Sequence, residues 1–471
     1  MKRVMIKFLT AVATTLILAA PAFAAPAADS APGSLRDTVV SSLEYNPDIK
    51  AFQEYRQAAV HDVSRARSGW LPRVDARAGW GVQQWSNVMT RQRPPQPLYG
   101  GKAQGDEGFH ERFEASIVLQ QIIWDGLATW NRYQFGVTRL DSAAARLWDN
   151  AEASTLDALL AHIEVYRQRR LVALSELNVQ NHKDILASQT KRQRLGVSSL
   201  ADVTQVQGRL ARSQASLVET KSALEIAMSS YKRLTGKDAG ELEAPYSPSE
   251  PYPSMEAALA DSQTKNPKVV ALEHDVKTAR AQKELDKAPF HPQVYFEVGP
   301  SYQWNLQASR TYNWGTDVML RAQWNLFNGF YDYYNVKGDA ARMRQAKQQV
   351  QTQTANNARE TASTWSSLIS AQEQGKFFVV AVDNNTRTRD MYMQQFNVGQ
   401  RSLLDLLDAE NELYNSSMQL VTANLNEIAA MYRLKALGGD LLASLGIDKA
   451  SLSINTDKLA EERRQQRQQQ Q

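Results

Sequence analysis

Residues 71–85 read LPRVDARAGWGVQQW, and the prediction of the fold starts from them. Between Val74 and Val82 an apolar residue or alanine alternates with a charged residue, a polar residue or glycine. A period of two with one apolar face is the pattern of a β-strand that is covered on one side. The pattern returns three times along the chain, so the sequence predicts four strands, at 73–86, 109–121, 293–304 and 313–326.

Two environments fit these strands. The apolar face either packs on helices in a soluble protein or meets lipid. Aromatic residues near the strand ends also occur at lipid boundaries, and here they are Trp80, Trp85, Tyr302, Trp304, Trp314 and Trp324. Four strands do not close a barrel alone, so the membrane interpretation requires several copies of the chain. The pattern itself leaves both environments open.

The chain contains two copies of one unit. Asn46-Pro47 returns 220 positions later as Asn266-Pro267. Trp124-Asp125-Gly126 returns 203 positions later as Phe327-Asn328-Gly329. The difference of 17 residues is extra length in the first copy, which we place in the loop 87–108 because it is rich in proline and glycine.

Long helices are predicted after each pair of strands. Residues 126–195 and 329–396 contain no proline and place apolar residues at helical spacing. At 1.5 Å per residue each helix is roughly 100 Å long, which favours a coiled coil or a helical tube. Shorter helical segments flank the strands and long helices, at 35–70, 199–235, 255–288 and 402–437.

Each unit therefore reads helix, β-hairpin, helix, helix. The first repeat spans 25–235 and the second spans 255–437. Residues 236–254 link them, and residues 438–457 finish the second. The tail 458–471 consists largely of glutamine, arginine and glutamate and is predicted to be disordered.

The start of the chain predicts export. Lys2, Arg3 and Lys7 precede an apolar run. Ala22-Phe23-Ala24 then supplies the small-x-small pattern that signal peptidase cuts. We therefore assign residues 1–24 to a signal peptide.

Composition excludes several classes of function. The formal net charge is +4, too small for a general nucleic-acid binder. The chain has no cysteine, which removes disulfides, thiolate metal sites, cysteine nucleophiles and a lipid tether at cysteine. The histidines lack metal-binding spacing, and neither a nucleophile elbow nor a P-loop is present. The sequence offers no catalytic residue, no metal site and no cofactor site.

The two helix–helix turns are the informative positions. They read LGVSSLAD at 195–202 and VGQRSLLDLLD at 398–408. Gly196 and Gly399 fit the end of a long helix. In each turn a serine then precedes an aspartate by three residues, the spacing of a capping box, in the pairs Ser199–Asp202 and Ser402–Asp405.

Asp408 is not explained by a cap. It lies three residues after Asp405, on the same helix face. Repeated around a symmetry axis, such pairs form a ring of negative charge, and Arg401 is placed to bridge to a neighbouring turn. A solvated helix face is the alternative, and the sequence alone leaves both open.

Together these features resemble the TolC-type outer-membrane efflux family. The resemblance rests on the NPDI start at 46–49, the ARSGWLP junction at 66–72, the tandem repeat, the Trp124-Asp125-Gly126 corner and the glycine turns. It covers about residues 35–440 and is nearest to the outer-membrane components of type I secretion systems. The SGWLPRVD junction is similar to the branch that exports large repeat adhesins.

The resemblance implies a fold that is mainly α with a β-barrel part. Three chains form a homotrimer, in which each contributes four strands to one twelve-stranded barrel in outer-membrane lipid. The helices form a long periplasmic tunnel. This implication favours the membrane environment for the strands and places the protein in the cell outer membrane, extending into the periplasm.

The resemblance also implies a gate at the periplasmic entrance. Arg401 matches the family's gating arginine, and Asp405 with Asp408 matches its aspartate pair. Asp202 matches the acidic partner on the first turn. Phe396 replaces a tyrosine, and Ala201 a threonine. Phe396 cannot donate a hydroxyl hydrogen bond to Asp202, so we expect Arg401 to carry more of the closure, through Asp202 or backbone carbonyls.

A periplasmic adaptor, or membrane fusion protein, is expected to dock on the two turns, at Gly196, Val197, Ser198, Ser199, Gly399, Gln400 and Ser402. The resemblance implies that an inner-membrane ABC transporter or proton-driven pump supplies the energy, so the chain is predicted to be a passive conduit and not an enzyme. The predicted function is type I secretion of a protein such as a large repeat adhesin. The alternatives are the outer-membrane component of a multidrug efflux pump and, from another class, a soluble periplasmic coiled-coil adaptor.

Overall fold

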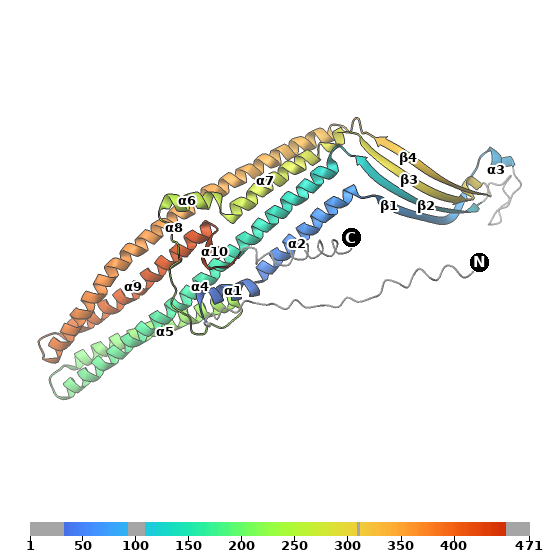
Figure 1. Cartoon of the computed structure of the whole chain (residues 1–471). Helices are drawn as coiled ribbons and strands as arrows, with labels where there is room; N and C mark the ends of the chain where they lie inside the picture. The colour runs from blue at the N-terminus through green and yellow to red at the C-terminus, as the bar shows by residue number, and fades with distance from the viewer. Residues whose placement is uncertain (1–32, 93–108, 309–310, 449–471) are drawn as a thin grey trace, which may run out of the picture.

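The structure is a computed structural model that describes residues 33–92, 109–308 and 311–448. The predicted signal peptide 1–24, the tail 458–471 and most of the loop 87–108 lie outside the described residues. The molecule is elongated, with a β-sheet at one end and the turns of two helical hairpins at the other (Figure 1). It is mainly α-helical.

Four antiparallel strands form one sheet in chain order. They are β1 (Arg73–Gln84), β2 (Phe109–Trp124), β3 (Gln293–Trp304) and β4 (Tyr312–Gln323). Two strand ends are set by the partner strand. Gln84 pairs with Phe109, the first residue of β2, so β1 ends two residues earlier than the sequence predicts. Gln323 pairs with Gln293, the first residue of β3, so Trp324 lies beyond β4.

β2 is longer than the sequence predicts, because β3 continues to pair with it. Ile122 opposes Tyr295, and after a register shift Trp124 opposes Val294. β1 and β4 each have one neighbour, so both edges of the sheet are open.

The two faces of the sheet differ in chemistry. Directly opposed residues share a face, and one row across the four strands is aliphatic, namely Val74, Leu119, Val298 and Val318. Another row on this face is aromatic, namely Trp80, Phe113, Trp304 and Tyr312. The opposite face carries polar rows such as Gly79, Glu114, Gln303 and Asn313. One face is therefore apolar across the whole sheet.

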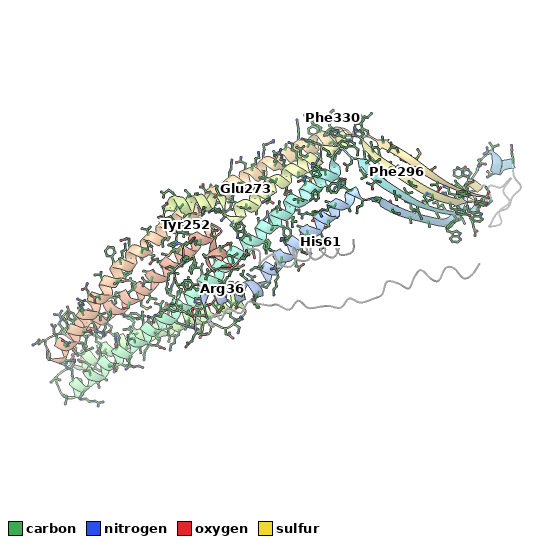
Figure 2. All side chains as sticks on the ribbon, viewed as in Figure 1. Arg36, His61, Tyr252, Glu273, Phe296 and Phe330 are labelled. Atoms are coloured by element: carbon green, nitrogen blue, oxygen red, sulfur yellow. The ribbon has the colours of Figure 1, made fainter. Side chains whose placement is uncertain are left out.

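Two helices of 67 residues each dominate the rest of the chain, α4 (Ala128–Arg194) and α8 (Tyr331–Asn397). Both follow a glycine and a second residue with positive φ, Gly126-Leu127 and Gly329-Phe330. Phe330 lies at the corner where α8 meets the sheet (Figure 2). The repeated corner gives both helices the same direction away from the strands.

Each long helix turns back into a shorter partner. These are α5 (Leu200–Thr235) and α9 (Leu403–Leu437). The hairpins α4/α5 and α8/α9 lie side by side and end together (Figure 1).

The segments 35–70 and 255–288 are broken helices and not single ones. They form α1 (Leu35–Tyr45) and α2 (Pro47–Arg67), then α6 (Met255–Thr264) and α7 (Pro267–Leu285). Each break falls at Asn-Pro, because the asparagine side chain caps the second helix and proline starts it without an N–H. Single-turn helices finish both segments, η1 (Ser68–Trp70) and η2 (Ala288–Phe290). Short helices also follow β1, as α3 (Val88–Gln92), and β3, as η3 (Leu306–Ala308).

The helices form one curved layer. Near the sheet the order of neighbours is α2, α4, α7, α8, and near the turns it is α5, α4, α9, α8. Where these halves meet, α1 and the short α10 (Leu441–Ser444) complete a core with Leu159 of α4 and the buried Tyr432 of α9. No helix among residues 33–92, 109–308 and 311–448 carries an apolar run long enough to cross a bilayer.

Candidate gate at the helical turns

The first turn, between α4 and α5, is closed by its own residues. Gly196 adopts a φ of 77°, and the Val197 N–H donates to the Arg192 carbonyl at 3.0 Å. The Ser199 hydroxyl accepts from the Asp202 N–H at 3.1 Å, and the Asp202 carboxylate accepts from the Ser199 N–H at 3.2 Å. The predicted capping box is therefore present in this turn.

Hydrogen bonds favour the ionised form of Asp202. The Ser198 hydroxyl donates to its carboxylate at 2.9 Å, and the Gln189 side chain donates in turn to Ser198. These hydrogen bonds, first that from Ser198 and then those from Ser199, lower the pKa of Asp202 below its usual value. Within the chain, Asp202 is occupied by its own turn.

The second turn, between α8 and α9, has the same backbone but a different use of its aspartate. Gly399 has a φ of 79°, and the Ser402 hydroxyl accepts from the Asp405 N–H at 3.1 Å. The Asp405 carboxylate makes an ion pair with Arg401 Nε at 3.2 Å instead of closing the box. Only half of the capping box predicted for Ser402 and Asp405 is formed.

Arg401 lies over an aromatic ring. Its guanidinium carbon is 4.0 Å from the centre of the Tyr392 ring. The described chain therefore directs Arg401 toward Tyr392 and Asp405 of its own hairpin, and not toward Asp202. The expected link between Arg401 and Asp202 is not made within one chain.

Asp408 also has a cationic partner. Arg209 of α5 approaches it at 3.0 Å, so this ion pair joins the two hairpins. Asp408 is itself more than half exposed. Within one chain, Arg401 and Arg209 thus offset the two carboxylates that were expected to form an acidic ring.

Phe396 closes the space between the hairpins. It is 5% exposed and packs with Ile185 of α4, Val206 of α5 and three leucines of α9, namely Leu403, Leu406 and Leu407. We call these six residues the tip cluster. The Phe396 side chain has no hydroxyl, so it contacts the rest of the tip cluster through packing alone.

Arg192 adds a second contact at Phe396. Its Nη1 donates to the Phe396 carbonyl at 2.9 Å. Its guanidinium carbon lies 4.6 Å from the centre of the Phe396 ring, a distance at which a cation is attracted to the ring. Arg192 therefore connects the end of α4 to the end of α8.

Sequence reasoning missed three residues of this site, namely Arg192, Arg209 and Tyr392. All three lie inside helices, outside the turn motifs at 195–202 and 398–408. Arg192 gives the one available signal, because a basic residue in the last turn of a helix can bind nearby carbonyls.

The residues expected to contact an adaptor lie at the accessible end of the molecule. Val197 and Gln400 are exposed at the tips of the two turns, as are Gly196, Ser199, Gly399 and Ser402, while Ser198 is partly buried. Among the described residues no group of three potential metal ligands comes together. The site is two adjacent turns that meet through an apolar cluster and ion pairs.

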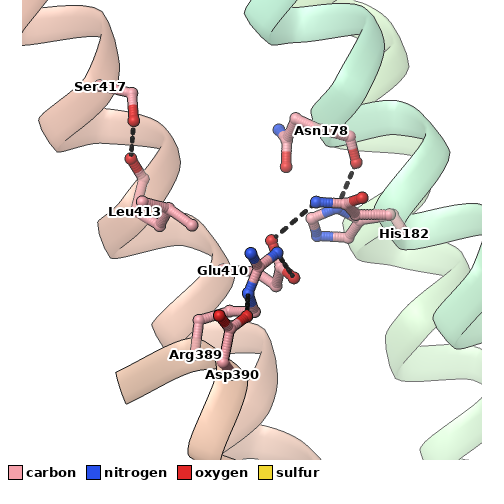
Figure 3. Close-up of polar contacts among 8 residues, drawn as sticks. Asn178, His182, Arg389, Asp390, Glu410, Leu413 and Ser417 are labelled. Carbon is pink, nitrogen blue, oxygen red and sulfur yellow. Dashed lines mark hydrogen bonds and ion pairs between the residues drawn. The ribbon is translucent and has the colours of Figure 1, made fainter. Parts of the chain in front are cut away.

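A second contact between the hairpins lies farther from the turns. Glu410 of α9 is 3% exposed and accepts from Arg389 of α8 and from Asn181 of α4, each at 3.1 Å (Figure 3). Burial disfavours the charge of Arg389, but its bonds to Glu410 and to Asp390 outweigh this and raise its pKa.

An open sheet with one apolar face, joined to paired hairpins with accessible turns, defines a channel-tunnel fold. Comparisons with known proteins agree. A family model described as outer membrane efflux protein matches residues 38–237 and 258–440. The chain belongs to the outer membrane efflux protein family. It is an outer-membrane protein whose helices extend into the periplasm, and its family consists of channels and not enzymes.

Curated relatives are distant but cover most of the chain. The outer membrane efflux protein BepC of Brucella suis is 22% identical over 395 residues, which cover 80% of this chain and 85% of BepC. The alkaline protease secretion protein AprF of Pseudomonas aeruginosa is 23% identical over 428 residues, which cover 88% of this chain and 84% of AprF.

Solved structures share the fold. The outer membrane protein VceC of Vibrio cholerae superposes with a TM-score of 0.72 at 17% identity and covers 88% of this chain and 96% of VceC. The CmeC outer membrane channel of Campylobacter jejuni gives a TM-score of 0.74 at 12% identity, with 88% of each chain covered. The fold predicted from the sequence, a helical body with a small antiparallel sheet, is confirmed.

Proposed function

We propose that three copies of this chain close into one tube, a twelve-stranded barrel in the outer membrane continued by a helical tunnel in the periplasm. One observation carries the proposal. The sheet has a continuous apolar face and two open edges, β1 and β4, and an open edge is not tolerated in lipid. Pairing β4 of one copy with β1 of the next removes every edge.

The helical layer supports the same closure. Its open edges are α2 and α8 near the sheet, and α5 and α8 near the turns. In both halves of this layer one edge helix belongs to the first repeat and the other to the second. Such edges fit a head-to-tail contact, which closes into a ring. A soluble adaptor, the alternative from another class, does not account for the apolar sheet.

The tube acts as a passive conduit. Its polar sheet face lines the water-filled barrel, and its apolar face meets lipid. A periplasmic adaptor docks on the two turns, and an inner-membrane ABC transporter or proton-driven pump provides the energy. Nothing in the described site calls for a cofactor.

The turns form the gate. Arg401, Asp405, Asp408, Asp202 and Phe396 surround the closed entrance. Opening requires α8/α9 to move away from α4/α5, which exchanges one packing for another and breaks the contacts at Phe396 and Asp408. Docking of the adaptor favours the open packing because it binds the turns in that arrangement.

The proposed cargo is a protein exported by type I secretion, as AprF is named for alkaline protease secretion. A large repeat adhesin is the specific candidate, which rests on the SGWLPRVD junction. Multidrug efflux is the second candidate, because the toluene efflux pump outer membrane protein TtgF of Pseudomonas putida is also 23% identical.

Planar-bilayer recording tests the conduit and its gate. The wild-type protein should give long-lived channels of small conductance, and Arg401→Ser should raise the conductance because it removes the cation that holds Asp405. Absence of any channel from folded protein would contradict the conduit, and unchanged conductance would remove Arg401 from the gate.

Deletion of the gene separates the two cargoes. Secretion predicts that one large protein disappears from the cell surface and culture medium while tolerance of toluene and dyes is unchanged. Loss of tolerance with an intact set of secreted proteins would favour efflux instead.

A further inference from the structure

The seam between the two hairpins changes character along its length. At the turns its interior is apolar, because the tip cluster fills it, and the Arg209–Asp408 ion pair lies beside this cluster. Between the tip cluster and the core around Leu159, polar contacts cross the seam, namely Asn181 with Glu410 at 3.1 Å, Ser175 with Tyr414 at 2.9 Å and Arg167 with Asn426 at 2.8 Å. The seam therefore has a sealed end and a polar stretch above it.

Glu410 is the one charged residue among those three pairs that is fully buried. Its Oε1 accepts from Arg389 and its Oε2 accepts from Asn181 (Figure 3). Arg389 lies on α8, in the same hairpin as Glu410, whereas Asn181 lies on α4 in the other hairpin. The charge of Glu410 is thus neutralised inside its own hairpin.

This arrangement matters when the hairpins separate. A buried carboxylate that loses its cation is strongly destabilised, whereas the loss of one hydrogen bond to a neutral amide costs much less. Because Arg389 moves together with Glu410, separation breaks only one of the two bonds to Glu410, the hydrogen bond from the Asn181 amide. The ion pair remains intact in both arrangements.

On the α4 side of this contact, the side chains near Asn181 make few hydrogen bonds. Asn178 (Figure 3) precedes Asn181 by three residues in α4, about one helical turn, and no donor among the described residues reaches its buried Oδ1. His182 is buried, and its Nδ1 is within hydrogen-bond distance of the Asn178 carbonyl on its own helix. Neither side chain adds a second bond across the seam to Glu410.

We propose that Asn181, Glu410 and Arg389 are positioning residues for the gate, a latch in which one hydrogen bond from a neutral amide holds the α8/α9 hairpin to α4 while the ion pair moves with the hairpin. The latch rests on the proposed gate, because it has a role only if the hairpins part. It sets how readily they part, and the tip cluster sets how tightly the entrance seals. We refer to these three residues as the Glu410 latch.

Substitutions at Asn181 should change the latch in opposite directions. Asn181→Asp places a second carboxylate against Glu410, so repulsion should increase the population of separated hairpins about tenfold or more, the factor that corresponds to a lost hydrogen bond to a charged group. Asn181→Lys adds a cation across the seam and should decrease that population. Ala187→Asp, at an exposed position of α4, is the control for charge.

Spin labels measure the separation directly. Val197→Cys and Val398→Cys introduce one thiol at each turn, where both positions are exposed. The natural chain has no cysteine, so no other residue is labelled. Labelled chain is assembled with an excess of unlabelled chain, so that each assembly carries one labelled copy. Electron–electron distance measurements should show one short distance in the wild type and in Ala187→Asp, a growing long distance in Asn181→Asp and only the short one in Asn181→Lys.

Two outcomes would overturn the latch. In one, Asn181→Asp retains the wild-type distances. In the other, Asn181→Asp and Asn181→Lys shift them in the same direction, which indicates a general loss of packing. Circular dichroism checks that each variant is folded. If Asn181→Asp does not fold, the comparison of Asn181→Lys with the wild type still tests the latch. Because the distances are read without ion flow, a failed latch stays distinct from a failed conduit, which the Arg401→Ser recording tests.

Discussion

α4 and α8 occupy equivalent places in the two repeats and have the same length of 67 residues, yet their surroundings differ. α4 buries side chains along its whole length, because α2, α5, α7 and α9 flank it on both sides. α8 has neighbours on one side only and buries few residues, namely Asp339, Ala346, Asn357, Thr361, Leu368, Ala371, Gly375 and Phe396. α8 is therefore an open edge of the helical layer, and we expect another copy of the chain to cover it.

The repeat shows which part of that edge is incomplete. Phe377 of α8 is 71% exposed, whereas its equivalent 203 positions earlier, Leu174 of α4, is partly buried. Leu174 lies seven residues from Asn181, on the helix face that meets α9. By the same symmetry, the Phe377 face of α8 should meet α5 of another copy.

The largest effect is expected in the enclosed helix. Leu159 of α4 is fully buried in the core with Tyr432 and Leu441. Leu159→Ala should lower the free energy of unfolding by about 3–5 kcal/mol, because the cavity is walled on all sides. Leu368→Ala on the one-sided α8 should cost less, and denaturant unfolding compares the two. Equal losses would erase the distinction between the helices.

A charge on the apolar face of the open-edged sheet should have the next largest effect. Val318→Lys should cost about 2–4 kcal/mol per copy near the bilayer centre, which reduces insertion into lipid vesicles. Asp317→Lys, the adjacent residue on the polar face, is the matched control and should insert normally. If both variants insert equally well, the apolar face does not meet lipid.

The edge of α8 can be tested with its own control. Phe377→Asp should weaken assembly by about 1.5–3 kcal/mol, the burial of one aromatic side chain, and it should shift the detergent-solubilised protein toward single chains. Val380 is 58% exposed, and its equivalent Leu177 is exposed on the enclosed α4 as well, so Val380→Asp should leave assembly intact. Analytical ultracentrifugation distinguishes them, and the opposite order of effects would mean that this face of α8 does not meet a neighbour.

The smallest effect concerns the two turns. Asp202 closes a capping box and Asp405 does not, so Asp202→Asn should destabilise its turn by about 0.5–1 kcal/mol and Asp405→Asn by less. Hydrogen exchange at the first turns of α5 and α9 reports both.

The pH dependence of this effect follows from the lowered pKa of Asp202. Because the carboxylate is favoured in the folded state, its contribution is complete above the usual aspartate pKa and is lost as the pH falls through the lowered value. A contribution from Asp202 that persisted at lower pH would show that its charge plays no part in the cap.

The sequence predicted what depends on local pattern. Alternation gave the strands, and their ends shifted only because a strand needs a partner, as at Gln84 and Gln323. The absence of proline marked the long helices. The Asn-Pro breaks at Asn46 and Asn266 were visible in the sequence, but their effect on the helix was not predicted.

The contacts of the gate were harder to predict. Serine and aspartate spacing found the turns, and the same spacing suggested identical caps in both. The structure separates them because Arg401 competes for Asp405. Arg192 and Arg209 meet Phe396 and Asp408 across about 200 residues of sequence, and such pairings follow from helix packing, which no local pattern records.

The central claim is that copies of this chain join head to tail and close at three. Cysteines placed at Arg73 and Gln323 mark the helix-side ends of β1 and β4, which lie at opposite edges of one sheet. Three strand spacings and a four-residue offset along the strands, since Arg73 lies in the row of Met319, separate the two positions by roughly 20 Å within one copy. A short bifunctional thiol reagent should therefore link neighbouring copies. The account predicts a ladder of one, two and three chains that stops at three. A product that stops at two chains, or a ladder that continues beyond three, would contradict it.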